Sequence, residues 1–375
     1  SDMSQKVVAE LQKRISQEPG LFDFRKSDTP PLLLVLDRRD DPVTPLLTEW
    51  TYQAMVHELI GIVNNRVDLR NVPGIKKDMI EVVLSPEQDA WYKSAMFLNF
   101  GDLGEKVKEL VDEYQSKTKS NQNIESLDDI KNFIENYPEF KKLSGNVSKH
   151  VTLMGELSRL VDNRSLLDVS AWEQELANRN DHSFHLKIVK EALANSKLNM
   201  YDQVKLVLLY ALRYELNASN EIAQLTQTLL DNQIPAELVS NVTAVLQYGG
   251  ASVRGGDLFK GGLFKGGLMK TLQSFKLKGV TNIYTEHKPL LKYILEMVLA
   301  NKLKDTDYPF SFGNPTKDPP QDIIVFIAGG ITYEEALTVH EFNTSGTGVR
   351  IILGGSFIHN SKTFLRDVSN LLKMK

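Results

Sequence analysis

The sequence contains no cysteine. Disulfide bonds, thiolate metal sites, iron–sulfur clusters and cysteine nucleophiles are therefore excluded. The chain also lacks an apolar run of the roughly 18 residues that a membrane-spanning helix needs. Its first residues do not show a basic segment followed by an apolar one, as a secretory leader would. These absences predict a cytosolic protein with no transmembrane segment, whose association with any membrane is peripheral.

Neither sign of charge dominates the chain. The 44 Lys and Arg residues stand against 48 Asp and Glu residues, which gives a net charge of -4. This balance is too even for the whole molecule to be attracted to nucleic acid. Hydrophobic residues make up 42% and charged residues 25% of the 375 residues, as in ordinary globular proteins. We therefore expect two or three folding units and no nucleic-acid partner.

The common catalytic motifs are absent as well. There is no H-E-x-x-H zinc motif and no G-x-S-x-G nucleophile turn. His182 and His185 come closest to a metal-binding pair, but no carboxylate follows at ligand spacing. The segment Gly329–Thr332 could hold a phosphate at a helix N-terminus, although two glycines after a buried strand more often form a tight turn. We expect no metal and no cofactor.

Three apolar runs predict a parallel β-sheet. Residues 32–36 and 323–327 are apolar without interruption, and residues 349–353 are apolar except for Arg350, as expected for strands that helices cover on both faces. Parallel strands pair through helical crossovers, so the three runs are expected to share one sheet. Helices are predicted over residues 4–16, 49–59 and 332–342, the last opened by a Thr332/Glu335 capping box, and from about residue 362.

The long insertion between the first two strands is predicted to be mainly α-helical. Residues 100–116 and 127–161 are amphipathic stretches joined by a polar segment, which is typical of an antiparallel helical hairpin. Pro138 is expected to kink or interrupt the second stretch. Val204–Leu212 is apolar nearly all round, as in a core helix. The tandem Phe-Lys-Gly-Gly-Leu repeat over residues 259–268 is expected to be a flexible surface loop.

The acidic segment after the first strand allows two interpretations. Asp37, Asp40 and Asp41 follow a parallel strand at the edge where open α/β sheets place ligands, so they could hold Mg²⁺ for phosphoryl transfer. In the alternative, which we favour, Asp37 and Asp41 accept hydrogen bonds from the Thr44 region and pair with Arg38, fixing a proline-rich turn.

The helical hairpin also leaves two alternatives open. A projecting arm offers a face on which amphipathic helices of a partner can pack. Equally, its apolar stripe could pack entirely on the hairpin's own domain. Periodicity alone does not separate the two.

Four long segments resemble one family. The run L-V-L-D-R-R-D-D-P-V-T-P-L-L-T-E-W that opens Leu34–Leu59 resembles the signature of the SM (Sec/Munc-like) proteins, which regulate SNARE assembly. Phe133–Glu156, Pro320–Leu337 and Val349–Ser356 are similar to the endosomal, vacuolar-protein-sorting branch of that family. The resemblance covers nearly the whole chain from about Leu21 onward.

The resemblance implies an α/β fold in which a partial parallel-sheet body is interrupted by a large, mainly α-helical insertion domain with a long helical hairpin. It also implies that the family's N-terminal domain is missing. The Ser1-Asp2-Met3 start is typical of residues left by cloning, so we expect the chain to begin partway through a larger protein. The expected segments are 1–57 and 318–375 for the α/β domain, 58–165 for the hairpin subdomain and 166–317 for a second helical subdomain.

For function, the resemblance implies a chaperone that templates or proofreads SNARE complexes at endosomal, trans-Golgi or vacuolar membranes. Its partners would be syntaxin-like and other SNARE proteins, and it would have no catalytic activity and no cofactor. The implied signature residues, structural in role, are Asp37, Arg38, Asp41, Thr44 and Pro45. The expected SNARE-binding residues on the hairpin are Leu110, Tyr114, Ile130, Phe133 and Phe140, with Pro138 setting the angle of the arm.

Overall fold

The computed structural model describes residues 1–375 except 24–28, 123–126, 255–282, 313–319 and 374–375, and it describes no side chains for residues 119–139. The Phe-Lys-Gly-Gly-Leu repeat lies outside the described residues. The chain forms two compact units. Unit 1 comprises Ser1–Leu47 and Asp168–Lys375, and unit 2 comprises Thr48–Leu167. The four segments expected from the sequence stay a prediction.

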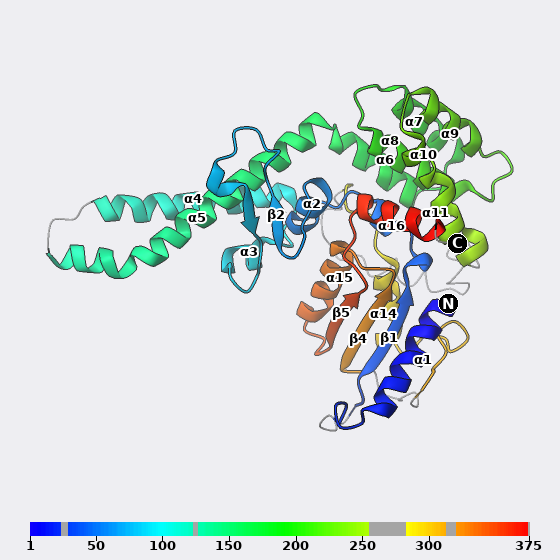
Figure 1. The fold of residues 1–375 in the computed structure, drawn as a ribbon, viewed down its shortest axis with the longest axis horizontal. Coiled ribbons are helices and arrows are strands. Elements are labelled where there is room, and N and C mark those ends of the chain that lie inside the picture. The colour runs from blue at the N-terminus through cyan, green and yellow to red at the C-terminus, as the bar shows by residue number, and fades with distance from the viewer. Residues whose placement is uncertain (24–28, 123–126, 255–282, 313–319, 374–375) are drawn as a thin grey trace. The chain divides into compact units, whose positions relative to one another are not determined.

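Unit 1 contains the predicted parallel sheet. Strand β1 (Leu32–Asp37) pairs with β4 (Asp322–Ala328), which pairs with β5 (Arg350–Gly355), so the order is β1-β4-β5 and all pairs are parallel (Figure 1). The register places Leu34 opposite Val325. The sheet and its pairing are therefore confirmed, although the first and second strands are separated by most of the chain.

The two faces of this sheet differ in burial. One face is buried under α14 (Leu290–Leu299) and α15 (Tyr333–Thr344) in a shared apolar core. The other face packs against α1 (Asp2–Gln17), whose apolar residues are only half-buried. On that second face Ile324 is 41% and Ile352 is 55% exposed. The prediction that helices cover both faces of every strand is therefore wrong for β4 and β5.

The helical part of unit 1 surrounds α8 (Met200–Tyr214). Residues 202–212 of α8 are all buried, which confirms the predicted core helix. The surrounding helices are α6 (Leu166–Asn178), α7 (His182–Ala194), α9 (Ile222–Asp231), α10 (Ala236–Val239), α11 (Asn241–Gly249), α12 (Ala251–Arg254) and the C-terminal α16 (Ser361–Lys373). Phe364 of α16 and Val43 after β1 belong to the same apolar core as α8.

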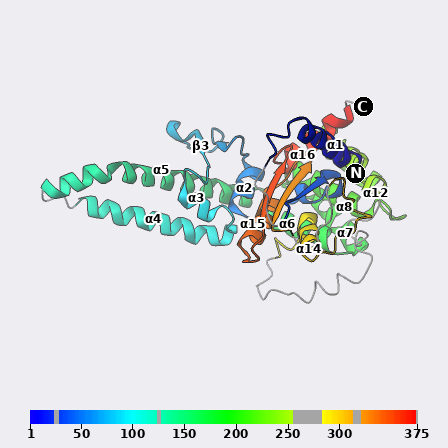
Figure 2. The same cartoon turned by 90° about the horizontal axis from the view of Figure 1, so that it is seen from below.

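Unit 2 consists of a small base and a hairpin of two long helices. The base contains α2 (Tyr52–Leu59), an antiparallel ribbon of β2 (Arg66–Asp68) and β3 (Glu81–Val83), and α3 (Ala90–Ala95). The hairpin is formed by α4 (Phe100–Gln122) and α5 (Leu127–Asn163), which lie side by side in both ribbon views (Figures 1 and 2). The insertion is mainly helical as predicted, but it also contains this β-ribbon, which was not predicted.

Helix α5 differs from its prediction in one respect. It runs for 37 residues as one helix and includes Pro138 without a break. Of the two effects expected of Pro138, an interruption of the helix is therefore wrong. A kink within one continuous helix stays a prediction. Helix α4 also extends to Gln122, into the segment expected to be a polar loop. Alternating charged side chains such as Glu113 and Lys117, which pair at 2.8 Å, support its outer turns.

Candidate functional site

The signature segment after β1 forms a buried ionic joint. Arg38 is 2% exposed, and its Nη1 donates to both carboxylate oxygens of Glu335, at 2.8 and 2.9 Å. Glu335 also accepts a hydrogen bond from the backbone amide of Thr332, and the side chain of Thr332 accepts from the amide of Glu335. The predicted capping box of α15 is confirmed. The joint thus fixes the end of β1 to the start of α15, 297 residues away.

Asp41 completes this joint on a second side. Its carboxylate accepts hydrogen bonds from the amide and hydroxyl of Thr44, at 3.0 and 2.6 Å, and from the amide of Leu290 at the start of α14. Nη2 of Arg38 lies 3.5 Å away. Burial alone would raise the pKa of Asp41, but Arg38 and the bonds from Thr44 hold that pKa below its ordinary value. Pro45 lies buried in the short turn after Thr44.

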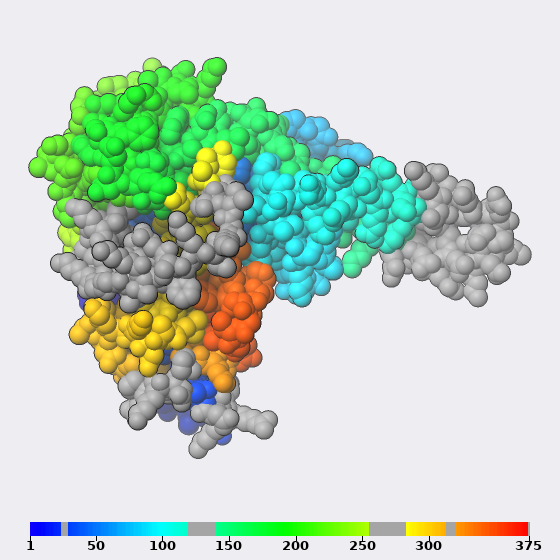
Figure 3. Space-filling view, turned by 180° about the vertical axis from the view of Figure 1, so that it is seen from behind, coloured from blue at the N-terminus to red at the C-terminus, as the bar shows by residue number. Residues whose placement is uncertain are grey.

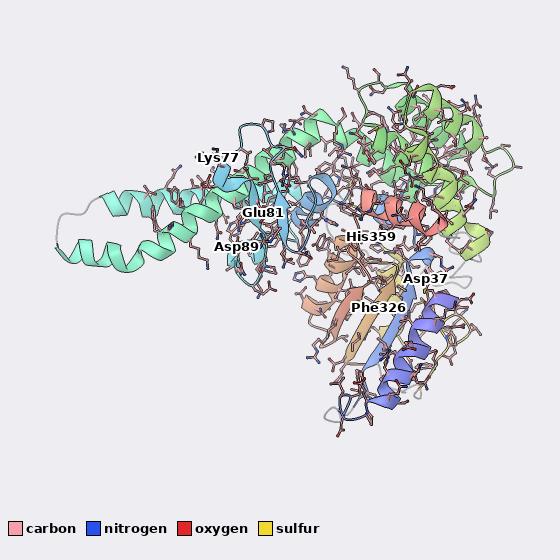
Figure 4. All side chains as sticks on the ribbon, in the orientation of Figure 1. Asp37, Lys77, Glu81, Asp89, Phe326 and His359 are labelled. Atoms are coloured by element: carbon pink, nitrogen blue, oxygen red, sulfur yellow. The ribbon has the colours of Figure 1, made fainter. Side chains whose placement is uncertain are left out.

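Asp37 has a different partner from the one expected. Asp37, labelled in Figure 4, accepts hydrogen bonds from the amide and guanidinium of Arg39 and from the hydroxyl of Ser1, and not from Arg38. Burial would raise the pKa of Asp37, but these hydrogen bonds lower it overall. Since the oxygens of Asp37 and Asp41 are occupied by separate sets of donors, the two carboxylates do not face a common ion position. The geometry favours the structural interpretation of this segment.

The glycine turn after β4 has no amide left for a phosphate. Gly329 and Gly330 have φ angles of +94° and +100°, which favour glycine. The amides of residues 329–332 donate in turn to the hydroxyl of Ser356, the carbonyls of Ile327 and Phe357, and the carboxylate of Glu335. A phosphate would have to displace all of these acceptors. The segment is a tight turn, and the phosphate interpretation is wrong.

The histidine pair of α7 binds tyrosines. Nε2 of His182 lies 2.9 Å from the hydroxyl of Tyr210, and Nδ1 of His185 lies 2.7 Å from the hydroxyl of Tyr214. Within the described part of the chain, no group of three potential metal-ligating side chains is present. His185 is therefore a hydrogen-bonded core residue of unit 1, and His182 is a half-buried residue held by Tyr210.

The hairpin of unit 2 carries the residues expected to bind a partner. Leu110 is 3% exposed and belongs to a buried stripe on α4 that includes Leu103 and Val107. One turn further out, Tyr114 is half-buried, as is Phe140 of α5, and their rings stack with centroids 5.5 Å apart. Leu110 thus stabilises the hairpin in this conformation, whereas Tyr114 and Phe140 are partly accessible.

The remaining residues of that expected face are Ile130, Phe133 and Pro138, whose side chains lie outside the described residues. The outer surface of α4 is uncovered in the space-filling view (Figure 3). The SNARE-binding role of all six hairpin residues stays a prediction.

A second cluster of polar side chains lies where the hairpin joins its base. Asp89 is 3% exposed, and His150 of α5 is fully buried. Nε2 of His150 lies 2.9 Å from a carboxylate oxygen of Asp89, and Nζ of Lys149 lies 2.5 Å from the same oxygen. This cluster could not be predicted from the sequence, because Asp89 and His150 are 61 residues apart. The available signal was an Asp directly before a short helix, where it caps the helix.

Comparison with known proteins identifies the family. A model of the Sec1 family matches residues 1–367. The chain belongs to the Sec1 family. It is 51% identical over 369 residues to vacuolar protein sorting-associated protein 45 of Rattus norvegicus, covering 98% of this chain and 64% of that protein. It is 39% identical over 388 residues to the Saccharomyces cerevisiae protein of the same name.

Solved structures agree with this family. The SM protein Vps45, solved in complex with the Qa SNARE Tlg2, matches 98% of this chain at a TM-score of 0.88 and 45% identity, and 65% of that chain is covered. The Unc18–syntaxin 1 complex of Monosiga brevicollis has the same fold, at a TM-score of 0.74 and 20% identity. The chain therefore spans about two thirds of the length of the relatives that it matches. Its resemblance to the vacuolar-protein-sorting branch is confirmed.

Proposed function

We propose that this chain is the part of an SM-type SNARE chaperone that holds SNARE helices on the α4–α5 hairpin. The observation that carries the proposal is its 45% identity, across 98% of the chain, to an SM protein whose structure was solved with a Qa SNARE bound. Its partners are syntaxin-like and other SNARE proteins. It acts at endosomal, trans-Golgi or vacuolar membranes, where those partners recruit it.

The physical role of such a hairpin is to reduce a conformational search. SNARE segments are disordered alone and lose backbone entropy when they form helices. A preformed helical surface holds two segments in register and so raises the rate of productive zippering. Tyr114 and Phe140 support this role, because both are partly exposed aromatic side chains at the outer part of the described hairpin, and aromatic residues dominate binding energy at interfaces.

The protein acts in this proposal without catalysis. Two observations support that view: the carboxylates of Asp37 and Asp41 are fully engaged within the fold, and the turn after β4 has no amide left for a phosphate. No helix within the described residues is long and apolar enough to span a bilayer, which agrees with recruitment through partners.

The proposal is tested by titrating a fluorescently labelled Qa-SNARE motif peptide with the chain. Tyr114→Ala is expected to weaken binding about fivefold or more, as for a typical aromatic interface anchor. The matched control is Val63→Ala, because Val63 is a 70% exposed side chain in the same unit that belongs to neither α4 nor α5. Equal affinity of both variants would contradict the assigned face, and no binding by the unmodified chain would contradict the function.

A further inference from the structure

The carboxylate of Asp89 joins two helices of unit 2. Asp89 caps the N-terminus of α3 by accepting a hydrogen bond from the amide of Tyr92 at 3.0 Å. From α5 it receives the side chains of Asn146, at 3.3 Å, Lys149 and His150. The carboxylate of Asp89, which is labelled in Figure 4, thus binds four donors, of which three come from adjacent turns of one long helix.

His150 extends this contact to a third helix. The hydroxyl of Tyr52 in α2 lies 2.8 Å from Nδ1 of His150. Burial would raise the pKa of Asp89, but its hydrogen bonds hold that pKa well below the ordinary value, so Asp89 is an ionised carboxylate that only accepts. Nε2 of the neutral ring therefore carries the proton, and Nδ1 accepts from the hydroxyl of Tyr52. The ring of His150 donates from Nε2 to Asp89, and it lies tilted against the ring of Trp91, with centroids 4.2 Å apart. A single neutral tautomer of His150 therefore links α2, α3 and α5.

The cluster lies between two parts of α5 that differ in packing and in helix propensity. On its C-terminal side, Leu153, Leu157 and Val161 are buried in the base of the hairpin. On its N-terminal side stand Pro138 and Gly145, the two residues of this stretch with the lowest helix propensity. No atom lies within 4 Å of the position that a Cβ on Gly145 would occupy, so no close packing requires that glycine.

We propose that Asp89, Lys149 and His150 are positioning residues of the partner-binding hairpin. They fix α5 at residues 146–150 to α2 and α3, so bending of the arm is confined to the part of α5 before Asn146. We call these three residues the hairpin clamp. The inference rests on the proposed function, because the arm that the clamp holds is the one that binds SNARE helices there.

Asp89→Asn separates the clamp from the helix cap. Asn caps helices as well as Asp does, so α3 keeps its cap, whereas Lys149 and His150 lose their anionic acceptor. The matched control is Asp181→Asn, because Asp181 caps α7 through the amide of Phe184 at 3.1 Å and makes no ion pair with a lysine or arginine among the described contacts. Lys149→Arg retains the charge and the donors and is expected to behave as the unmodified chain.

The experiment is hydrogen–deuterium exchange of the whole chain, read by peptide. Asp89→Asn is expected to raise exchange about tenfold at amides 143–153 of α5, and to leave α3 and all of unit 1 unchanged. Unchanged exchange in α5 would overturn the proposal. A uniform rise across unit 2 would also overturn it, since that is the result of general destabilisation. Lys149→Met retains the apolar stem of the side chain, and it should raise the exchange rate of the same amides by a smaller factor. This second variant tests the proposal even if Asp89→Asn does not fold.

The consequence for function is measured separately, as the rate of SNARE-complex assembly with each variant. Asp89→Asn should slow assembly several-fold, and Lys149→Arg should not. If the unmodified chain does not accelerate assembly, the proposed function fails, while the exchange experiment still decides whether the clamp fixes α5.

Discussion

Single residues of the signature segment show how a buried charge is paired with an opposite one. Arg38 and Glu335 are both nearly inaccessible, with side-chain exposures of 2% and 1%. Lys205 of α8 and Glu173 of α6 form a similar pair at 2.8 Å. Removal of a charge from water costs several kcal/mol, which only a good partner offsets. Such pairs help to specify which elements pack together. A different packing that buried one of these charges without its partner would not offset the cost of removing that charge from water.

The first prediction concerns the joint at the end of β1. Glu335→Gln retains the shape of the side chain and can still complete a capping box, but it leaves Arg38 without its main anionic partner. We expect the free energy of unfolding to fall by about 3 kcal/mol, measured by urea denaturation. The control is Glu341→Gln, whose ion pair with Lys292 at 3.1 Å is on the surface and should change stability by less than about 0.5 kcal/mol. Equal losses in both variants would contradict the role assigned to Arg38.

The second prediction concerns the pH dependence of His150. Burial lowers the pKa of His150 below its ordinary value of 6.5, although Asp89 acts in the opposite direction. The unfolded chain therefore takes up a proton near pH 6.5 that the folded chain takes up only at lower pH. This contribution to stability is complete above pH 6.5 and is lost as the pH falls through the folded pKa, at up to about 1.4 kcal/mol per pH unit.

The measurement is the free energy of unfolding between pH 7.5 and 5.5, compared with His150→Gln. The groups that face the ring are Tyr52, Asp89, Tyr92 and Lys149. The pKa of Asp89 lies far below this range and burial keeps Tyr52 protonated, so neither of these two groups titrates in it. The variant should therefore show a smaller slope. Identical slopes would mean that His150 does not titrate differently in the folded chain.

Among the elements, α5 contains residues of low helix propensity even in its well-packed C-terminal half. Gly155 lies inside this helix, and a Cβ there would meet no atom within 4 Å. Gly155→Ala should therefore stabilise the protein by about 0.5–1 kcal/mol, seen as a higher melting temperature. At Gly250, in contrast, a Cβ would lie 2.3 Å from the carbonyl oxygen of Leu246, and Gly250→Ala should destabilise. A loss of stability on Gly155→Ala would show that this face of α5 is covered.

The elements also show which features can be predicted from sequence. The strands at residues 32–36, 323–327 and 349–353 were predictable because each is a short run of mainly apolar, β-branched or leucine residues that ends in a turn signal. Strands β2 and β3 were not, because three residues each are too few for a period to be visible. The partners of Asp41 within its own turn were predictable, whereas Glu335 as the partner of Arg38 was not, because nothing in the sequence specifies a contact across 297 positions.

At the scale of the whole molecule, the proposed function depends on the family to which the chain belongs and on the hairpin of unit 2. The Sec1 family match covers residues 1–367, and the related solved complexes contain syntaxin-like SNAREs. In the function that we propose, such segments align on the hairpin of unit 2. That task would need no catalysis, since alignment alone lowers the entropy that assembly costs.

The most direct test of this account is a hydrogen-exchange footprint of a Qa-SNARE motif peptide on the chain. If SNARE helices bind the hairpin, saturating peptide should slow hydrogen exchange at amides of α4 and α5, with the largest change around Tyr114 and Phe140. Protection confined to unit 1, or no protection anywhere in the hairpin while the peptide is bound, would contradict it.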